Sequence, residues 1–239
     1  MTGLPSEAKG QTPYPENAGH FPGQYDLICI GASWGGLHAV GRILSDIPLE
    51  LTQAIVVAQH RHPDSFEAAL PELLGLQIPR PVRDIEDKLE IEPSRVYVAP
   101  PDYHVLVERG SFALSLEERV HYARPSIDVL FESAADAYRE RVIGVILTGA
   151  NEDGAAGLRR IKESGGVAIV QDPAQAVRRA MPDAAIAATV ADAVLPLEEI
   201  GRFLYGLCVA PAAKRPVRES RPVDGGRGNR EVRPEEAQR

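Results

Sequence analysis

The sequence predicts an α/β fold: a doubly wound, mostly parallel sheet with helices on both faces and an antiparallel β-hairpin insertion. Three observations predict it. Short apolar runs alternate with amphipathic helical stretches through the middle of the chain. Most of these runs are apolar at every position, as expected of parallel strands that helices cover on both faces. The stretch 103–122 differs, because two strand-like runs flank Arg109-Gly110 and predict a hairpin.

Five strands of the main sheet are expected, each a short run rich in β-branched and other apolar residues. In chain order they are Asp26–Ile30, Ala54–Ala58, Val96–Ala99, Ile143–Leu147 and Val167–Val170.

Two helices are marked most clearly. One follows Pro125, where Ser126 suits the N-cap position. Its apolar residues recur at helical spacing on one stripe: Ile127, Leu130, Phe131, Ala134 and Tyr138. The other spans about 155–164, and Gly165-Gly166 ends it.

Both ends of the chain lack a periodic apolar pattern and are rich in Pro, Gly and charge. Segments 1–24 and 211–239 are therefore predicted to be disordered, leaving one folded domain over 25–210. The net charge is −8, and the last segment holds eight basic and five acidic residues. The first segment carries −1 and the last +3, so the predicted domain carries −10, which argues against a nucleic-acid-binding surface on it.

The composition is that of a soluble globular protein, with 44% apolar and 25% charged residues. No apolar run approaches the roughly 20 residues that span a bilayer, so no membrane insertion is expected. The N-terminus lacks the apolar stretch of a secretory signal. Cys29 and Cys208 each lie in an apolar run and are expected to be buried free thiols of a cytoplasmic protein.

The first candidate site segment is DLICIGASWGGLHAV, in which a strand leads through Gly31-Ala-Ser33-Trp-Gly35 into a helix. This matches G-x-S-x-G, the sharp turn that presents a nucleophilic serine above a sheet. The helix N-terminus that follows offers N–H groups to a developing oxyanion. The alternative is a dinucleotide loop, but Ser33 occupies its middle glycine and no ribose-binding acid ends the second strand.

His60 follows the second strand directly, which places it beside Ser33 at the same edge of a parallel sheet. A general base must lie within hydrogen-bond reach of its nucleophile, and neighbouring strand ends provide that. A second interpretation is that His60, His62 and Asp64 form an H-x-H-x-D zinc site. Asp64 also suits the start of a helix after Pro63.

Asp153 follows the strand that ends at Leu147 and lies at the entrance of the next helix. By itself it would be interpreted as a helix N-cap. With Ser33 and His60 expected at the same edge, it is predicted to be the acid that orients the histidine of a catalytic triad. The chain order Ser, His, Asp differs from the Ser, Asp/Glu, His order of α/β-hydrolases.

Several segments together resemble the catalytic domain of the chemotaxis protein-glutamate methylesterases, CheB. They are IGASWGG, AQH, YVAPPDYH, PSIDVLFESAA, LTGANEDGAAG and QDPAQAVRRAMPDAAI, in order from about Asp26 to Ala188. The resemblance implies a serine esterase that hydrolyses γ-glutamyl methyl esters on the cytoplasmic domain of methyl-accepting chemoreceptors, and possible glutamine deamidation. It assigns Ser33 as nucleophile, His60 as base and Asp153 as acid, without a cofactor or metal.

The chain departs from that family in three ways. Full-length members carry an N-terminal receiver domain, whereas about 24 residues precede the first strand here, so we expect a stand-alone domain without phospho-regulation in cis. Trp34 follows the nucleophile where members often have Thr. Arg61 and Ala150 replace frequent methionines, which places substrate choice in question more than reaction type. The alternatives are a non-catalytic receptor- or partner-binding module, the zinc hydrolase and, least favoured, a nucleotide-dependent oxidoreductase.

Overall fold

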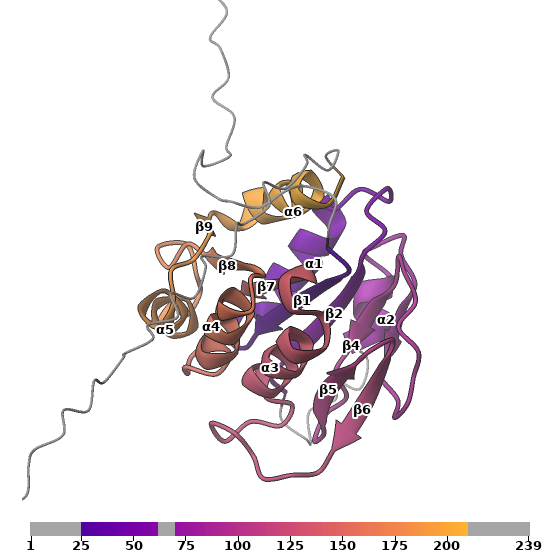
Figure 1. The fold of residues 1–239 in the computed structure, drawn as a ribbon. Helices are drawn as coiled ribbons and strands as arrows, with labels where there is room; N and C mark the ends of the chain where they lie inside the picture. The colour runs from indigo at the N-terminus through magenta and orange to yellow at the C-terminus, as the bar shows by residue number, and fades with distance from the viewer. Residues whose placement is uncertain (1–24, 62–69, 210–239) are drawn as a thin grey trace, which may run out of the picture.

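The computed structural model describes residues 25–61 and 70–209, which build a seven-stranded sheet beside a separate two-stranded one (Figure 1). Neighbouring strands of the large sheet all run parallel, in the order β3-β4-β2-β1-β7-β8-β9. The strands are β1 (Leu27–Ala32), β2 (Ala54–Gln59), β3 (Val82–Asp84), β4 (Val96–Val98), β7 (Val142–Ile146), β8 (Val167–Gln171) and β9 (Ala193–Leu195).

The central strand β1 pairs with β2 on one side and β7 on the other. After β1 the chain proceeds through β2 toward β3 and β4, and then returns to place β7 against the free edge of β1. The strand order therefore reverses between β1 and β7. In doubly wound sheets the ligand crevice lies outside the carboxyl ends of the strands at such a switch point.

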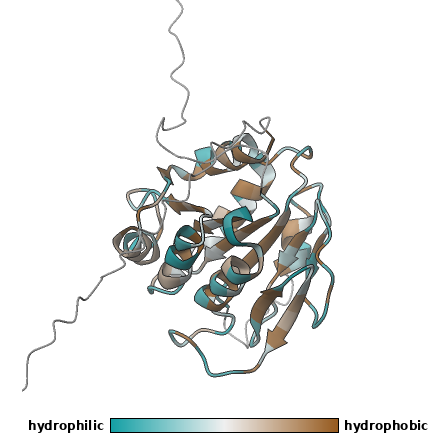
Figure 2. Ribbon diagram, viewed as in Figure 1, coloured by the Kyte–Doolittle hydropathy of each residue, from teal (hydrophilic) through white to brown (hydrophobic). Residues whose placement is uncertain are grey.

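Helices cover both faces of the sheet, as Figure 1 shows. On one face lie α1 (Gly36–Asp46), α2 (Leu70–Gly75) and α6 (Leu197–Val209), and on the other α3 (Ile127–Tyr138), α4 (Ala155–Glu163) and α5 (Ala180–Ala188). Successive β1 residues alternate between the two cores: Ile28 and Ile30 pack with α1, Leu27 and Cys29 with α3. Figure 2 accordingly shows hydrophobic strands between helices with hydrophilic outer faces.

The two-stranded sheet is an antiparallel hairpin of β5 (His104–Glu108) and β6 (Ser111–Ser115), with Gly110 in the turn at φ 84°. Val105, Val107 and Phe112 join the core on the α3 face. A short 3₁₀ helix, η2 (Arg139–Arg141), links α3 to β7. The hairpin therefore extends that core sideways rather than lengthening the sheet.

The structure confirms the predicted fold class and places all five expected strands within two residues of their expected ends. The Ser126-capped helix, the helix near 155–164 and the hairpin are likewise confirmed, and both cysteines are buried free thiols. The segments predicted to be disordered, 1–24 and 211–239, lie outside the described residues. Among the described helices, none is long and apolar enough to cross a bilayer.

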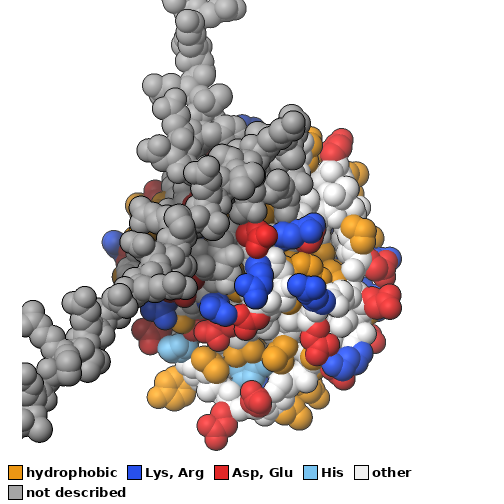
Figure 3. Space-filling view, viewed as in Figure 1, with side chains coloured by type: hydrophobic (Ala, Val, Ile, Leu, Met, Phe, Trp, Pro, Cys, Tyr) orange, Lys and Arg blue, Asp and Glu red, His pale blue; other side chains and the backbone are white. Residues whose placement is uncertain are grey.

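On the face seen in Figure 3, acidic and basic side chains are interspersed. Exposed ion pairs link neighbouring elements, such as Arg160 with Asp136 at 2.6 Å and Lys88 with Glu108 at 3.2 Å. Such pairs stabilise a protein by less than about 1 kcal/mol each. The free energy of folding therefore comes mainly from the two apolar cores.

The close contact of α3 and α4 yields a stability prediction. A Cβ at Gly157 would lie 2.6 Å from Cβ of Phe131 and 3.0 Å from the backbone of Asp128. Because backbone cannot move aside cheaply, Gly157→Ala should lower the free energy of unfolding by about 1–3 kcal/mol. Urea denaturation measures this, and Gly110→Ala is no suitable control because its φ is positive. Gly75→Ala, whose Cβ would meet no atom within 4 Å, is the matched control.

Candidate active site

Ser33 lies one residue past β1, in the turn that leads into α1. Its N–H donates to the Thr148 carbonyl at 3.0 Å, and its carbonyl accepts from Gly36 N–H at 2.9 Å. Gly35 reverses the chain with φ 81° before the helix begins, a conformation that favours glycine. The serine is thus held at a fixed strand–turn–helix junction, as the G-x-S-x-G pattern predicts.

Gln59 ties the two strand ends of the site together. Its Nε2 donates to the Ser33 carbonyl at 2.8 Å and to the His60 carbonyl at 3.0 Å. A Cβ at Gly36 would stand 2.1 Å from Oε1 of Gln59, so only glycine leaves room for this side chain. Sequence reasoning did not identify Gln59, although a polar residue ending a buried strand directly before His60 is a signal.

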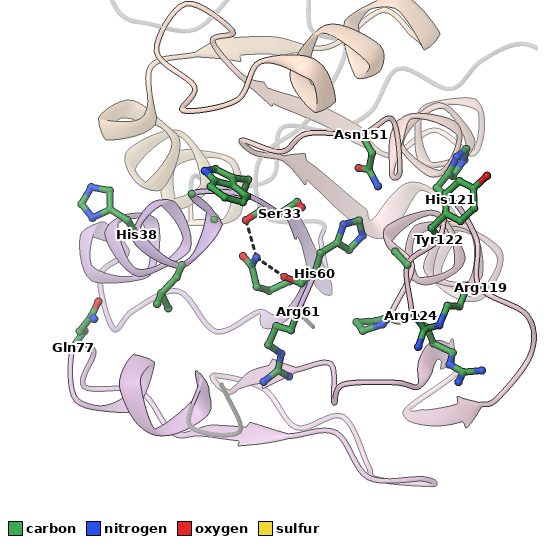
Figure 4. Close-up of a pocket in the computed structure, with 17 residues that line it drawn as sticks. Ser33, His38, His60, Arg61, Gln77, Arg119, His121, Tyr122, Arg124 and Asn151 are labelled. Atoms are coloured by element: carbon green, nitrogen blue, oxygen red, sulfur yellow. Dashed lines mark hydrogen bonds between the residues drawn. The ribbon is translucent and has the colours of Figure 1, made fainter. Parts of the chain in front are cut away.

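His60 follows β2, and its N–H donates to the Ala32 carbonyl at 3.0 Å. Since Ala32 pairs with Gln59 and adjacent strands lie about 4.8 Å apart, Ser33 and His60 are neighbours at the sheet edge. The Nε2 atom of His60 lies 2.7 Å from Oδ2 of Asp153. Figure 4 shows the side chains of Ser33 and His60 facing the same groove.

The Asp153 side chain is fully buried, and four donors surround its carboxylate. Oδ2 accepts from His60 and from Ile127 N–H, both at 2.7 Å. Oδ1 accepts from the Ser126 hydroxyl at 2.8 Å and from Asp128 N–H at 3.0 Å. Asp153 therefore binds the N-terminus of α3, whereas its own helix α4 is capped by Gly154 without a side-chain bond.

These contacts fix the ionisation of Asp153. Burial by itself raises the pKa of its carboxyl, but the hydrogen bonds from His60, Ile127 and Asp128 act against it and prevail, so the pKa lies below its usual value. The positive end of the α3 dipole acts in the same direction. Asp153 is thus an anion near neutral pH, and an ionised carboxylate only accepts hydrogen bonds.

His104 stabilises the start of α3, which holds Asp153. It is buried, and its Nδ1 accepts from Ser126 N–H at 3.2 Å while Nε2 lies 3.0 Å from the Glu118 carbonyl. Accepting at Nδ1 requires the neutral tautomer with the proton on Nε2, which then donates to the carbonyl. His104 and Ser126 thereby fix the start of α3 that holds Asp153.

A second buried carboxyl, Asp128, lies beside Asp153. Its Oδ1 accepts from Gly157 N–H at 2.7 Å, and Oδ2 lies 3.4 Å from Nε2 of His121. Burial raises the pKa of Asp128 to about 6, and the charge of Asp153 adds to the rise. Asp128 thus loses its charge in mildly acidic solution while Asp153 keeps its own.

A groove of about 940 Å³ opens above the serine and histidine. Trp34 and Tyr122 stand at its rim with 63% and 96% of their surface exposed, and the Arg178 guanidinium lies 5.6 Å from the centre of the Trp34 ring. Its described lining residues are Ser33, Trp34, Gly35, Gly36, Leu37, His38, Gln59, His60, Arg61, Gln77, Arg119, His121, Tyr122, Ala123, Arg124, Pro125 and Asn151.

The predicted site residues Ser33, His60 and Asp153 thus meet at the carboxyl edge of the sheet. The described residues contain no cluster of three His, Cys, Asp or Glu side chains placed to hold a metal ion. His62 and Asp64, which the zinc interpretation requires, lie outside the described residues.

The fold and the site define a doubly wound α/β protein with a Ser/His/Asp constellation at its switch point. Residues 28–204 match the CheB methylesterase family model. The chain thus belongs to the CheB methylesterase family.

Relatives share this similarity along most of the described chain. A putative protein-glutamate methylesterase/protein-glutamine glutaminase of Leptospira interrogans is 46% identical over 187 residues, covering 77% of this chain and 95% of the relative. Protein-glutamate methylesterase/protein-glutamine glutaminase 1 of Hahella chejuensis is 40% identical over 197 residues. The match covers 81% of this chain and 53% of that protein. The protein-glutamate methylesterase FrzG of Myxococcus xanthus is 39% identical over 77% of this chain and 55% of its own length.

A solved structure gives the same result. The CheB methylesterase catalytic domain of Thermotoga maritima superimposes with a TM-score of 0.72 at 33% identity, covering 76% of this chain and 97% of that domain. The fold is therefore that of a CheB catalytic domain.

The pKa of Asp128 leads to a prediction about stability and pH. Because its pKa is raised in the folded state, ionisation opposes folding, and this group lowers stability as pH rises from about 4 to about 6. Asp128→Asn keeps an acceptor for Gly157 and removes the charge. It should increase the free energy of unfolding by about 1–2 kcal/mol at about pH 7.5 and by little at about pH 4.5. Urea denaturation at both pH values checks this, and a variant less stable at the higher pH would contradict it.

Proposed function

We propose that this protein is a protein-glutamate methylesterase that hydrolyses γ-glutamyl methyl esters on the cytoplasmic domain of chemoreceptors. Ser33 is its nucleophile, His60 its general base and Asp153 the acid that orients His60. The observation that carries the proposal is the 2.7 Å contact between His60 and a fully buried Asp153 at the strand end beside Ser33. Family membership and the names of the relatives support the assignment of glutamyl methyl esters as the substrate.

The contact also assigns the two nitrogens of His60. Since the Asp153 carboxylate only accepts, the hydrogen bond between them requires a proton on Nε2. Nδ1 is then the unprotonated nitrogen that takes the proton of Ser33. The familiar triad uses the nitrogens the other way round, with Nδ1 bonded to the aspartate. The chemistry is unchanged, because either nitrogen of imidazole accepts a proton.

In the proposed mechanism, Oγ of Ser33 attacks the γ-carbonyl carbon while its proton passes to Nδ1 of His60. The carbonyl electron pair moves onto oxygen, where the backbone N–H of Trp34 stabilises it. The intermediate collapses, and methoxide leaves with the proton from Nδ1 as methanol. Water then attacks the glutamyl-enzyme carbonyl as His60 takes its proton, and the bond to Ser33 Oγ breaks as His60 returns that proton to Oγ, which leaves the receptor's glutamate side chain as the free carboxylate. With ammonia as the leaving group, the same steps describe the glutaminase activity in the relatives' names.

The proposal is tested by methanol release from methylated receptor. Ser33→Ala should reduce the release to background while the thermal unfolding temperature stays within a few degrees of wild type, because the hydrogen bonds that hold Ser33 are made by its backbone N–H and carbonyl, which Ala keeps. Stoichiometric labelling of Ser33 by a fluorophosphonate probe should accompany wild-type activity. Methanol release retained by Ser33→Ala would refute the assignment of Ser33 as the nucleophile.

The same assay separates the alternatives. A chelator would abolish turnover in a zinc hydrolase using His60, His62 and Asp64, and it should leave this enzyme active. A non-catalytic binding module would bind receptor without releasing methanol or reacting with the probe.

Asp153→Asn tests the acid. The amide is isosteric, but it presents an N–H₂ group to donors or to His60, so the imidazole loses its enforced tautomer. We expect kcat to fall by about 10³–10⁴-fold with KM little changed. Steady-state kinetics on methylated receptor measures this, with Asp136→Asn on the exposed side of α3 as the matched control. A decrease in kcat smaller than about tenfold would exclude Asp153 from the triad.

A further inference from the structure

Asn151 lies in the loop between β7 and α4, between two residues that are fixed to the catalytic groups. Two positions before it, a Cβ at Gly149 would be 3.0 Å from Cβ of Ser33, so the loop backbone passes directly against the nucleophile. Two positions after it, Asp153 binds His60. Asn151 is therefore the middle of a short bridge from one catalytic side chain to the next.

The loop is anchored on the serine side. Gly149 N–H donates to the Arg178 carbonyl at 3.0 Å, and its carbonyl accepts from Met181 N–H at 3.1 Å. Thr148 N–H donates to the Gln171 side chain at 2.9 Å, and the Thr148 hydroxyl donates to the Trp34 carbonyl at 2.9 Å. A side chain on this bridge is consequently held at a defined position relative to Ser33.

The Asn151 side chain lines the groove, and Figure 4 shows it pointing toward the space between Ser33 and His60. Its Oδ1 is buried and has no hydrogen-bond partner within the described residues. A buried amide oxygen without a partner is destabilising by roughly 1–3 kcal/mol, so an arrangement that keeps one needs an explanation. With Oδ1 as the buried end, Nδ2 is the end directed at the groove.

We propose that Asn151 is a further catalytic residue, whose side-chain N–H₂ donates a hydrogen bond to the acyl oxygen of the substrate. This inference rests on the proposed function. As the Ser33 Oγ–carbon bond forms, the carbonyl electron pair moves onto that oxygen and the serine proton passes to His60. A preorganised neutral donor stabilises the new negative charge without taking part in proton transfer. Asn151 thus supplements the backbone N–H of Trp34.

Two substitutions distinguish this role from a structural one. Asn151→Ala removes the donor, and kcat for methanol release should fall by about 100-fold while KM stays within about threefold. Asn151→Asp keeps the shape of the side chain but places a carboxylate near the developing oxyanion, and its kcat should lie at least about tenfold below that of the Ala variant. A residue needed only for loop packing would lower the thermal unfolding temperature in both variants, because Ala leaves a cavity and Asp buries an unpaired charge, without this order in kcat.

The rate of Ser33 phosphonylation by a fluorophosphonate probe is the second measurement, since it does not depend on the natural substrate. It should fall in the same order, wild type above Ala above Asp. Glu152→Gln is the matched control, because it changes the next residue in the same loop, whose side chain is 70% exposed. Both its kcat and its labelling rate should stay within about twofold of wild type.

The outcomes separate the two proposals. Asn151 variants that keep kcat and the labelling rate within about threefold of wild type, or that change only KM, would overturn the role of Asn151. The assignment of the triad would be unaffected. Wild-type protein that is labelled at Ser33 yet releases no methanol would overturn the receptor substrate, and the labelling rates would still decide Asn151. Wild-type protein that is not labelled at all would overturn both.

Discussion

The carboxylate of Asp153 is the interaction on which the geometry of the site depends. A fully buried charge is tolerated only where donors replace the water it has lost. Here the donors come from two separate parts of the chain: His60 after β2, and the start of α3, which supplies the Ser126 hydroxyl and the N–H groups of Ile127 and Asp128. Displacing any of them would leave the others around a poorly solvated anion. The end of β2, the start of α3 and the β7–α4 loop therefore keep a single relative arrangement.

The two carboxyls at the start of α3 show how closely this arrangement is balanced. Both are buried and both lie at the positive end of the same helix, yet their pKa values move in opposite directions. The number of donors accounts for the difference. Asp153 accepts four hydrogen bonds, whereas Asp128 accepts one from Gly157 and has only a longer contact with His121. Hydrogen bonds outweigh burial in the first case and fail to do so in the second. Asp153 therefore keeps the charge that holds His60 in one tautomer even in mildly acidic solution, where Asp128 loses its own.

Much of this was predictable from sequence, because parallel strands covered on both faces leave continuous apolar runs and their ends share one edge. That reasoning is sufficient to place Ser33 and His60 side by side from the sequence alone. The same reasoning did not predict the edge strands β3 and β9. Each has only three residues and is partly exposed, so neither shows a clear apolar pattern. Nor did it predict the partners of Asp153, because Ser126 and Asp128 lie more than 20 residues away and reach it only through the packing of α3 on α4. In the sequence, an acid at the start of a helix, such as Asp153, looks the same whether it caps its own helix or a distant one.

The charge around the groove fits ester hydrolysis in a further respect. The predicted domain is acidic overall, yet the described lining of the groove includes Arg61, Arg119 and Arg124 and contains no Asp or Glu. Arg119 and Arg124 share the single carboxylate of Asp102, so one positive charge remains between them. A methyl ester is neutral, whereas the tetrahedral intermediate and the glutamate product are anions. A positive surround therefore binds the transition state more strongly than the substrate, which is the condition for raising kcat.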